Sequence, residues 1–395
     1  MVNEVSHLFL YTVIVLVHGR ILEMQGFVKV RALRHLLAHV SAELLEDRLH
    51  ILHALIVGIG KQVNDGFQEG QDVYKRQVMD ETTNVPLGEV SFLLRYQQAQ
   101  MESYYGSMLG MTNVYGQDLS GTGTIYGETA KTSLMEQFNQ MYVLEAEAEN
   151  YGVEVTDDEK TAIADAAAQF MKDNDTKVQN ALGVTEADVE HVLTLMTIQE
   201  KMFAPLTVDV DTEVSDEEAA QKRIVYVYMS TAGTETDDDG NTIDLTDEEK
   251  AAKKQELQDI LDAAKESGDL KAAVDVANEN RDENSKLSAS ETTYGADSTT
   301  PVEEVRTAAD ALKDGELAEI VETDTGYYAV QMVSTFDEDA TANKKDSIVT
   351  ERKNTLYQEK CTELEEGHAF ETRDDVLADL TFDRIYKLNT ETAEE

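Results

Sequence analysis

The stretch Leu312–Val333, LKDGELAEIVETDTGYYAVQMV, carries more structural information than any other part of this 395-residue chain. It predicts a turn at Asp314-Gly315, an extended segment over Leu317–Val321 and a tight polar turn over Thr323–Gly326. An alternating strand over Tyr327–Val333 follows the second turn. The stretch therefore predicts two extended segments that are joined by a short turn.

The region before this stretch has a simple element order. Arg223–Met229 (RIVYVYM) alternates like a β-strand. We expect two charged helices next, over Asp247–Ser267 and from Leu270 to about Asn278, and then an irregular stretch over Arg281–Asp297. A third helix over Val302–Leu312 leads into the closing segment. The predicted order is strand, two helices, irregular stretch, helix and closing strands.

This order, with the motif L-K-x-G-E followed by V-x-T-x-x-G-Y, resembles the parvulin family of peptidyl-prolyl cis-trans isomerases, or rotamases. The resemblance covers residues 222–335. It implies a small antiparallel sheet wrapped by helices, and a pocket that binds proline.

The resemblance also implies the positions of the pocket residues. The two ring histidines of the family fall at Ile224, or a neighbour, and at Tyr328. The pocket aromatic falls at Val305, and the small polar residue before Gly-Tyr is Thr325. The acidic or thiol position falls near Asp282. Both histidines and the pocket phenylalanine are therefore replaced.

Prolyl isomerisation forms no covalent bond, but it must twist an amide through a barrier of about 20 kcal/mol. Tyr226 or Tyr228, together with Tyr328, can replace the histidine pair as orienting polar groups. Val305 shrinks the pocket relative to phenylalanine. We therefore expect weak or absent isomerase activity.

The region from about residue 83 to 210 is predicted to be entirely helical. Its first helix contains V-P-L-G-E-V-S-F-L-L-R-Y-Q-Q-A-Q-x-E, from Val85 to Glu102. This pattern resembles the N-terminal chaperone module of SurA/PrsA-type foldases. Thr156 and Thr185 each precede an acidic first turn and predict helix starts. The expected helices are Gly88–Leu109, Glu128–Tyr151, Asp157–Asp173 and Thr185–Ala204.

Aromatic and methionine side chains recur along the first helix at Phe92, Tyr96, Tyr104 and Met108. Flexible, polarizable side chains on a helical face can bind varied apolar clients, so these four are the candidate client-binding residues. The alternative is that they pack the core, as an apolar stripe at helical spacing usually does.

The formal net charge is −46, from 79 acidic and 33 basic side chains. This argues against nucleic acid or an anionic membrane surface as a partner. It favours salt-sensitive attraction to basic unfolded chains. The single cysteine, Cys361, excludes an intramolecular disulfide framework and a cysteine-rich metal site. We expect no cofactor and no metal.

Residues 1–77 differ chemically from the rest of the chain. They contain eight basic and eight acidic side chains, so the whole net charge lies in residues 78–395. The hexapeptide Asp72–Gln77 back-translates, with one choice of codons, to a transposon-adapter end. Our hypothesis is that this leader is a cloning or assembly chimera, and the alternative is an ordinary helical leader. The apolar run Leu8–Val17 lacks the basic flank and the cleavage site of an export signal.

The predicted fold class is α+β, with a mainly helical SurA-like chaperone module and an inserted parvulin-like domain. Asp337–Phe370 reads as one long charged helix that packs back on the helical module through Ile348, Leu356 and Leu364. The expected domains are 1–80 (leader of doubtful origin), 81–212 (helical module), 213–336 (parvulin-like domain) and 337–395 (returning helix and acidic tail).

The resemblance to parvulins and to SurA/PrsA-type foldases implies an extracytoplasmic folding factor that binds unfolded or nascent exported polypeptides. The alternative is a non-catalytic holdase, or client-binding protein, with a degenerate parvulin domain. The resemblance implies a cell-surface or secreted protein, attached to a membrane only through a lipid anchor or a signal that this chain does not show.

Overall fold

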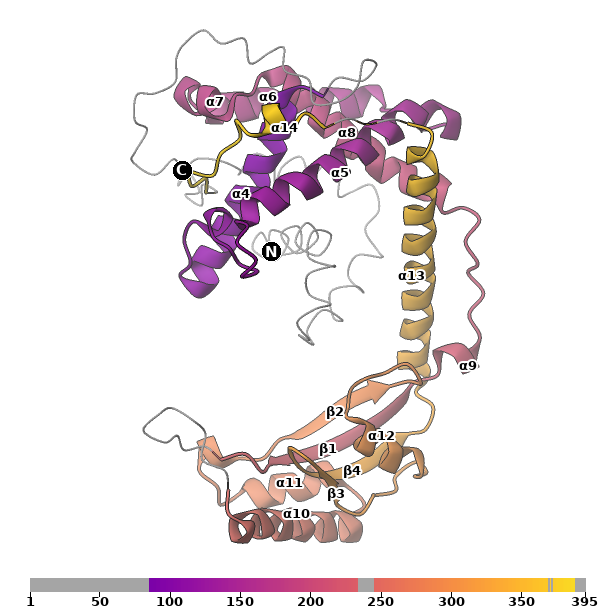
Figure 1. Cartoon of the computed structure of the whole chain (residues 1–395). Coiled ribbons are helices and arrows are strands. Elements are labelled where there is room, and N and C mark those ends of the chain that lie inside the picture. The colour runs from indigo at the N-terminus through magenta and orange to yellow at the C-terminus, as the bar shows by residue number, and fades with distance from the viewer. Residues whose placement is uncertain (1–84, 234–244, 369, 371, 388–395) are drawn as a thin grey trace, which may run out of the picture. The chain divides into compact units, whose positions relative to one another are not determined.

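The computed structural model describes residues 85–233, 245–368, 370 and 372–387 (Figure 1). The expectations for the leader, residues 1–80, lie outside the described residues. The chain divides into two compact units, of which the second is Asp211–Arg352. The first unit contains the described residues up to Val210 and from Lys353 onward. The second unit is therefore an insertion in the chain of the first.

The first unit is helical. Its core is built around α4, α5, α6 and α8, and the C-terminal part of the long helix α13 belongs to it. Its helices are α4 (Leu87–Leu109), η2 (Val114–Gly116), α5 (Tyr126–Glu147), η3 (Ala148–Tyr151), α6 (Asp157–Asp173), α7 (Thr176–Leu182), α8 (Glu186–Leu206), α13 (Glu338–Glu365) and α14 (Asp374–Leu377).

The helix ends follow local capping chemistry. The Thr156 hydroxyl accepts a hydrogen bond from Glu159 N at 3.3 Å, and the Glu159 carboxylate accepts one from Thr156 N at 2.7 Å. Thr185 and Asp188 form the same reciprocal pair at the start of α8. Gly183 ends α7 with a φ of 68°, which residues with a Cβ rarely adopt. The predicted starts of α6 and α8 are therefore confirmed.

Buried cations hold the C-terminal segment on α4 and α5. Arg95 donates to Thr381 O at 2.6 Å, and Lys131 donates to Leu377 O at 3.3 Å. The Arg95 guanidinium also lies 5.2 Å from the centre of the Phe382 ring. Five apolar side chains of the segment are buried: Val376, Leu377, Leu380, Phe382 and Tyr386. This short segment is thus part of the helical core.

The C-terminal part of α13 closes a second core in the same unit. Tyr357 and Cys361 are buried there against Met202 and Leu206 of α8, and Leu364 packs against them. The three apolar positions through which α13 was predicted to pack, Ile348, Leu356 and Leu364, are all half-buried, and Leu364 packs against this core.

A charged cluster joins α4, α5 and α8. His191 Nδ1 lies 2.8 Å from Glu89 Oε1, and His191 Nε2 lies 3.1 Å from Glu145 Oε1. Tyr142 donates to the other Glu89 oxygen at 2.6 Å. Hydrogen bonds to Glu145 and Glu89 outweigh burial and raise the pKa of His191 to about 10. The imidazolium is therefore the form that holds the three helices together.

The second unit is a four-stranded antiparallel sheet with helices on both faces. Its strand order is β2-β1-β4-β3, so β1 and β4 are central. The elements are α9 (Asp216–Ala219), β1 (Lys222–Ser230), α10 (Asp247–Ser267), α11 (Leu270–Asn278), η4 (Glu283–Ser285), β2 (Ala289–Tyr294), α12 (Glu303–Asp310), β3 (Val321–Thr323) and β4 (Gly326–Ser334). Together with the helical first unit, this sheet confirms the predicted α+β class.

Strand β2 lies within the stretch Arg281–Asp297 that was expected to be irregular, so that expectation was wrong. Its sequence, ASETTY, has no alternation of apolar and polar residues that would mark a strand. It forms because its backbone pairs with β1, from Ala289 opposite Val227 to Tyr294 opposite Lys222.

The two faces of the sheet pack against different helices (Figure 1). Val225, Val227 and Met229 of β1 bury against α10 and α11. Ile224 and Tyr226 lie on the opposite face, with α12. Alternation along β1 therefore places its even-numbered residues in a separate, smaller core.

We expect the first unit to depend on α13. Tyr357→Ala should lower its free energy of unfolding by about 3 kcal/mol, because the truncation leaves a cavity between α13 and α8. Urea denaturation followed by circular dichroism measures this loss. Thr355→Ala, at an exposed position of the same helix, is the matched control. A chain ending at residue 336 that melts as cooperatively and as high as the full chain would contradict this dependence.

We expect the His191 cluster to contribute stability that declines with rising pH. Because its pKa is raised in the folded state, the contribution is complete below the ordinary value of 6.5, falls above it, and is gone once the pH exceeds about 10. The difference in urea midpoint between the wild type and His191→Gln should therefore shrink over this range. A constant difference between these two pH values would count against the cluster.

Candidate functional site

The candidate site lies on the α12 face of the sheet. Tyr226 and Tyr228 come from β1 and Tyr328 comes from β4, and we call these three side chains the tyrosine face. In the antiparallel register Tyr228 stands directly opposite Tyr328, and Tyr226 stands opposite Val330. Residues at even positions of both strands therefore point to the same side.

The three rings form one aromatic cluster. The centroids of Tyr228 and Tyr328 are 4.7 Å apart with an interplanar angle of 36°. Those of Tyr226 and Tyr328 are 5.9 Å apart at 48°. Cross-strand aromatic pairs of this kind stabilise a sheet and leave one ring surface open to a partner. Tyr228 is 38% exposed, so the face is accessible.

The turn between β3 and β4 fixes one edge of the tyrosine face. The Tyr228 hydroxyl donates to Thr325 O at 2.7 Å, and Thr231 N donates to the same oxygen at 3.0 Å. A Cβ on Gly326 would lie 2.3 Å from Met229 O and 2.6 Å from the Tyr228 ring. The absence of a side chain at Gly326 thus lets β1 approach the turn and lets Tyr228 lie over it.

Helix α12 is anchored over the same face. Val305 and Ala309 are fully buried with Ile224. At the C-terminal end of α12, the Asp310 carboxylate accepts hydrogen bonds from the Tyr294 hydroxyl at 2.7 Å and from Lys222 Nζ at 2.8 Å. Burial and this carboxylate raise the pKa of Tyr294. The helix is therefore tied to both β1 and β2.

The predicted pocket residues occupy different places in the second unit. Tyr328 lies on the tyrosine face, and Ile224 and Val305 lie beneath it in the core. The main-chain oxygen of Thr325 holds Tyr228, while its hydroxyl lies 3.4 Å from that of Thr323. Asp282 is exposed and follows α11, which covers the other face of the sheet.

The candidate client-binding residues of α4 also separate into two groups. Phe92 and Tyr96 are buried, and Phe92 packs edge-on against Phe170 at 5.1 Å. Tyr104 is half-buried beside Tyr105, and Met108 is 65% exposed near the end of the helix. The part of this set that a client can reach is therefore the C-terminal end of α4.

The Tyr328 hydroxyl is neutral at physiological pH. Burial raises the pKa of Tyr328, and the neighbouring Tyr228, Tyr226 and Glu304 raise it further. A neutral phenol can both donate and accept a hydrogen bond. Among the described residues, the Tyr328 hydroxyl has no hydrogen-bond partner, so it is available to a bound peptide.

Three residues of the site were not singled out from the sequence as its main elements. Tyr226 and Tyr228 were alternatives to each other, and both belong to the cluster. Glu304 was not considered. Its signal in the sequence is its spacing of four residues from Ala308, which places both on one side of α12.

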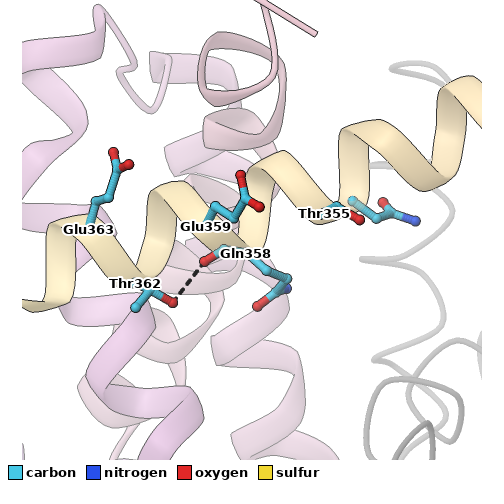
Figure 2. A pocket seen from close by; sticks show the side chains of 6 residues that line it. Thr355, Gln358, Glu359, Thr362 and Glu363 are labelled. Carbon is cyan, nitrogen blue, oxygen red and sulfur yellow. Dashed lines mark hydrogen bonds between the residues drawn. The ribbon is translucent and has the colours of Figure 1, made fainter. Parts of the chain in front are cut away.

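A hollow of about 690 Å³ lies along α13, and Figure 2 shows the six residues that line it and labels five of them. The Thr362 hydroxyl donates to Gln358 O at 2.9 Å, which is an ordinary bond within a helix. All six lining residues are polar and exposed: Asn354, Thr355, Gln358, Glu359, Thr362 and Glu363. The hollow has no buried group that would orient a ligand.

In the described part of the chain, no group of three or more His, Cys, Asp or Glu side chains is arranged to hold a metal ion. The helices that the structure describes include none with the length and apolar character needed to cross a membrane.

Comparison with known protein families identifies the type of domain in the second unit. The family profile described as the rotamase, PPIC-type PPIASE domain matches residues 237–350. This match confirms the parvulin resemblance of the second unit. Comparison with curated proteins found no match.

Solved structures of foldases are similar to the chain at low sequence identity. The foldase protein PrsA from Lactococcus lactis is 17% identical, with a TM-score of 0.33, over 78% of this chain and 98% of that one. PrsA from Streptococcus pneumoniae is 16% identical, with a TM-score of 0.29, over 67% and 97%. The peptidylprolyl isomerase PrsA from Bacillus anthracis is 18% identical, with a TM-score of 0.25, over 58% and 96%.

We expect Gly326→Ala to disrupt the tyrosine face. The added Cβ would meet the Met229 carbonyl oxygen, so β1 must shift, and the cost should be about 1–3 kcal/mol, as for other overpacked sites. Near-ultraviolet circular dichroism, which reports tyrosines in this tryptophan-free chain, should weaken. Gly106→Ala is the control, because its Cβ would find only an ordinary contact at 3.5 Å. Equal spectra for the two variants would contradict the close approach.

Proposed function

We propose that this protein is a folding factor whose second unit binds prolyl segments of unfolded polypeptides on the tyrosine face. The observation that carries the proposal is the cluster of Tyr226, Tyr228 and Tyr328. Tyr328 lies inside the region that the rotamase profile matches, residues 237–350, and the other two lie on the strand that precedes this region. An accessible aromatic surface suits the apolar pyrrolidine ring, and a free phenol beside it suits the adjoining amide.

Prolyl isomerisation makes few chemical demands on the tyrosine face. Rotation about an X–Pro bond breaks no covalent bond, so a catalyst has only to favour the twisted amide. Ring contacts can hold the proline, while the Tyr328 hydroxyl donates to, or accepts from, the peptide group. The Tyr228 hydroxyl is already engaged by the Thr325 carbonyl, so it stiffens the site and does not contact the amide.

We propose that isomerisation at this face is slow. The two places beneath the tyrosines are filled by Ile224 and Val305, both with no exposed surface. No histidine of the described residues lies on the tyrosine face. The surface is open at Tyr228, so a twisted amide stays hydrated and gains less from a single hydrogen bond than it would in a closed pocket.

A non-catalytic holdase is the second candidate function. The apolar side chains at the end of α4 favour it, since Met108 and Leu109 are 65% and 63% exposed. Exposed large apolar side chains that lie together commonly mark a protein-binding surface. In this case the rotamase domain would add a second, proline-selective contact to clients held by the helical unit.

The proposed clients are unfolded or nascent exported polypeptides. A formal net charge of −46 attracts basic chains and repels anionic surfaces. The proposed location is extracytoplasmic, at the cell surface or secreted, which is what the foldase resemblance implies. Fractionation of the source cells, followed by immunodetection of the chain, tests this location.

We expect exchange NMR on short X-Pro peptides to show weak catalysis that depends on Tyr328. Tyr328→Phe should lower the catalysed rate about ten-fold, because one orienting hydrogen bond of roughly 1.4 kcal/mol is lost. Tyr327→Phe is the matched control, since the adjacent ring packs on the opposite face with α10. Thr325→Ala should have little effect, because only its main-chain oxygen holds Tyr228.

The double variant Val305→Phe with Tyr328→His should raise the rate by restoring the residue types of the parvulin pocket. A phenylalanine at a fully buried valine site can itself cost about 1–3 kcal/mol, so folding must be checked by circular dichroism first. Robust turnover that is unchanged by Tyr328→Phe would place the isomerase site elsewhere.

A further inference from the structure

A carboxylate stands beside the tyrosine face. Helix α12 buries Val305 and Ala309, and Ala308 packs against the same core as Tyr328. Glu304 precedes Ala308 by four residues, so the two share one side of the helix. Glu304 is therefore the acidic residue of α12 on the side of the tyrosine face.

Its neighbour Glu303 is exposed, as Glu304 is, but lies on a different side of α12. Glu303 precedes Thr307 by four residues, and both are exposed. Both glutamates lie in the first turn of α12, where either one interacts favourably with the positive end of the helix. That general role therefore does not distinguish them. What distinguishes them is that Glu304 lies one turn before Ala308, which packs on the same core as Tyr328, whereas Glu303 lies one turn before the exposed Thr307.

Two other charged groups of α12, Arg306 and Asp310, are already engaged within the unit. Arg306 donates to the Ser298 carbonyl, and Asp310 pairs with Lys222 and accepts from Tyr294. Among the described residues, no basic side chain forms an ion pair with Glu304. Its carboxylate is thus available to a charged ligand.

We propose that Glu304 and the tyrosine face together select prolyl segments that carry a lysine or arginine directly beside the proline. This inference rests on the proposed function, because it names the substrate class of the same site. With the proline ring on the tyrosines, an adjacent cationic side chain reaches both an aromatic ring and the Glu304 carboxylate. Cation–π attraction and an ion pair would then act on one group.

The charge of the whole second unit acts in the same direction. Residues 211–352 contain 37 acidic and 14 basic side chains. This excess raises the local concentration of any basic peptide and lowers that of an acidic one. The excess is spread over the unit, however, whereas Glu304 acts at one position. A single substitution therefore separates the two contributions.

The test uses the full chain and capped six-residue peptides that differ at one residue beside a central proline. Lys-Pro and Pro-Lys peptides are compared with their Glu-Pro and Pro-Glu counterparts. Fluorine NMR of fluorotyrosine-labelled protein measures affinity, with the Tyr328 signal assigned through Tyr328→Phe, and exchange NMR measures isomerisation. At low salt the lysine peptide of at least one pair should bind about five-fold more tightly than its glutamate counterpart.

Glu304→Gln should remove most of this preference, and Glu303→Gln should leave most of it. Salt at about 0.5 M should also reduce it, since exposed charges are then screened within a few ångströms. Equal affinities for lysine and glutamate peptides, or equal losses in the two variants, would overturn the inference while leaving proline binding intact. If no peptide shifts the Tyr328 signal or is isomerised, the proposed function fails, and the preference fails with it.

Discussion

The backbone pairing of β1 with β4 determines the chemistry of the second unit. It sets Tyr228 opposite Tyr328 and directs both rings toward α12. A slip of one residue along β1 would turn Tyr226 and Tyr228 toward α10 and α11 and bring Val225 and Val227 to the other side. Gly326 permits the close strand approach, and the Tyr228–Thr325 hydrogen bond holds the end of the pair.

Tyrosines in place of histidines change what such a face can do. A histidine titrates near neutral pH and can carry a charge, whereas a buried phenol stays neutral and presents a large apolar ring. The raised pKa of Tyr328 strengthens that difference. The face is therefore suited to holding a proline and orienting its amide, and the charge needed for selectivity comes from a separate helix.

The helical unit gains its stability from parts of the chain that are far apart in sequence. Arg95 and Lys131 bond to main-chain carbonyls more than 240 residues away, and α13 supplies Tyr357 and Cys361 to a core otherwise made by α5 and α8. Phe92 and Tyr96 belong to the core of this unit. The apolar surface open to a client is correspondingly small and lies at the end of α4.

The helix starts and turns of this protein could be predicted from its sequence, because they depend on contacts between residues that are close in sequence. Thr156 and Thr185 cap helices through contacts three residues away, and the turn at Thr323–Gly326 is set by neighbouring residues. The closing motif, which lies within the region matched by the rotamase profile, could be predicted for the same reason.

Features that depend on residues far away in the sequence could not be predicted. Strand β2 has no pattern of its own and exists through its pairing with β1. Likewise, the register between β1 and β4 brings Tyr226 and Tyr228 next to Tyr328, whereas Asp282 lies apart from them. A period-two sequence pattern shows which residues share a face of one strand. It does not show which residues of another strand lie beside them.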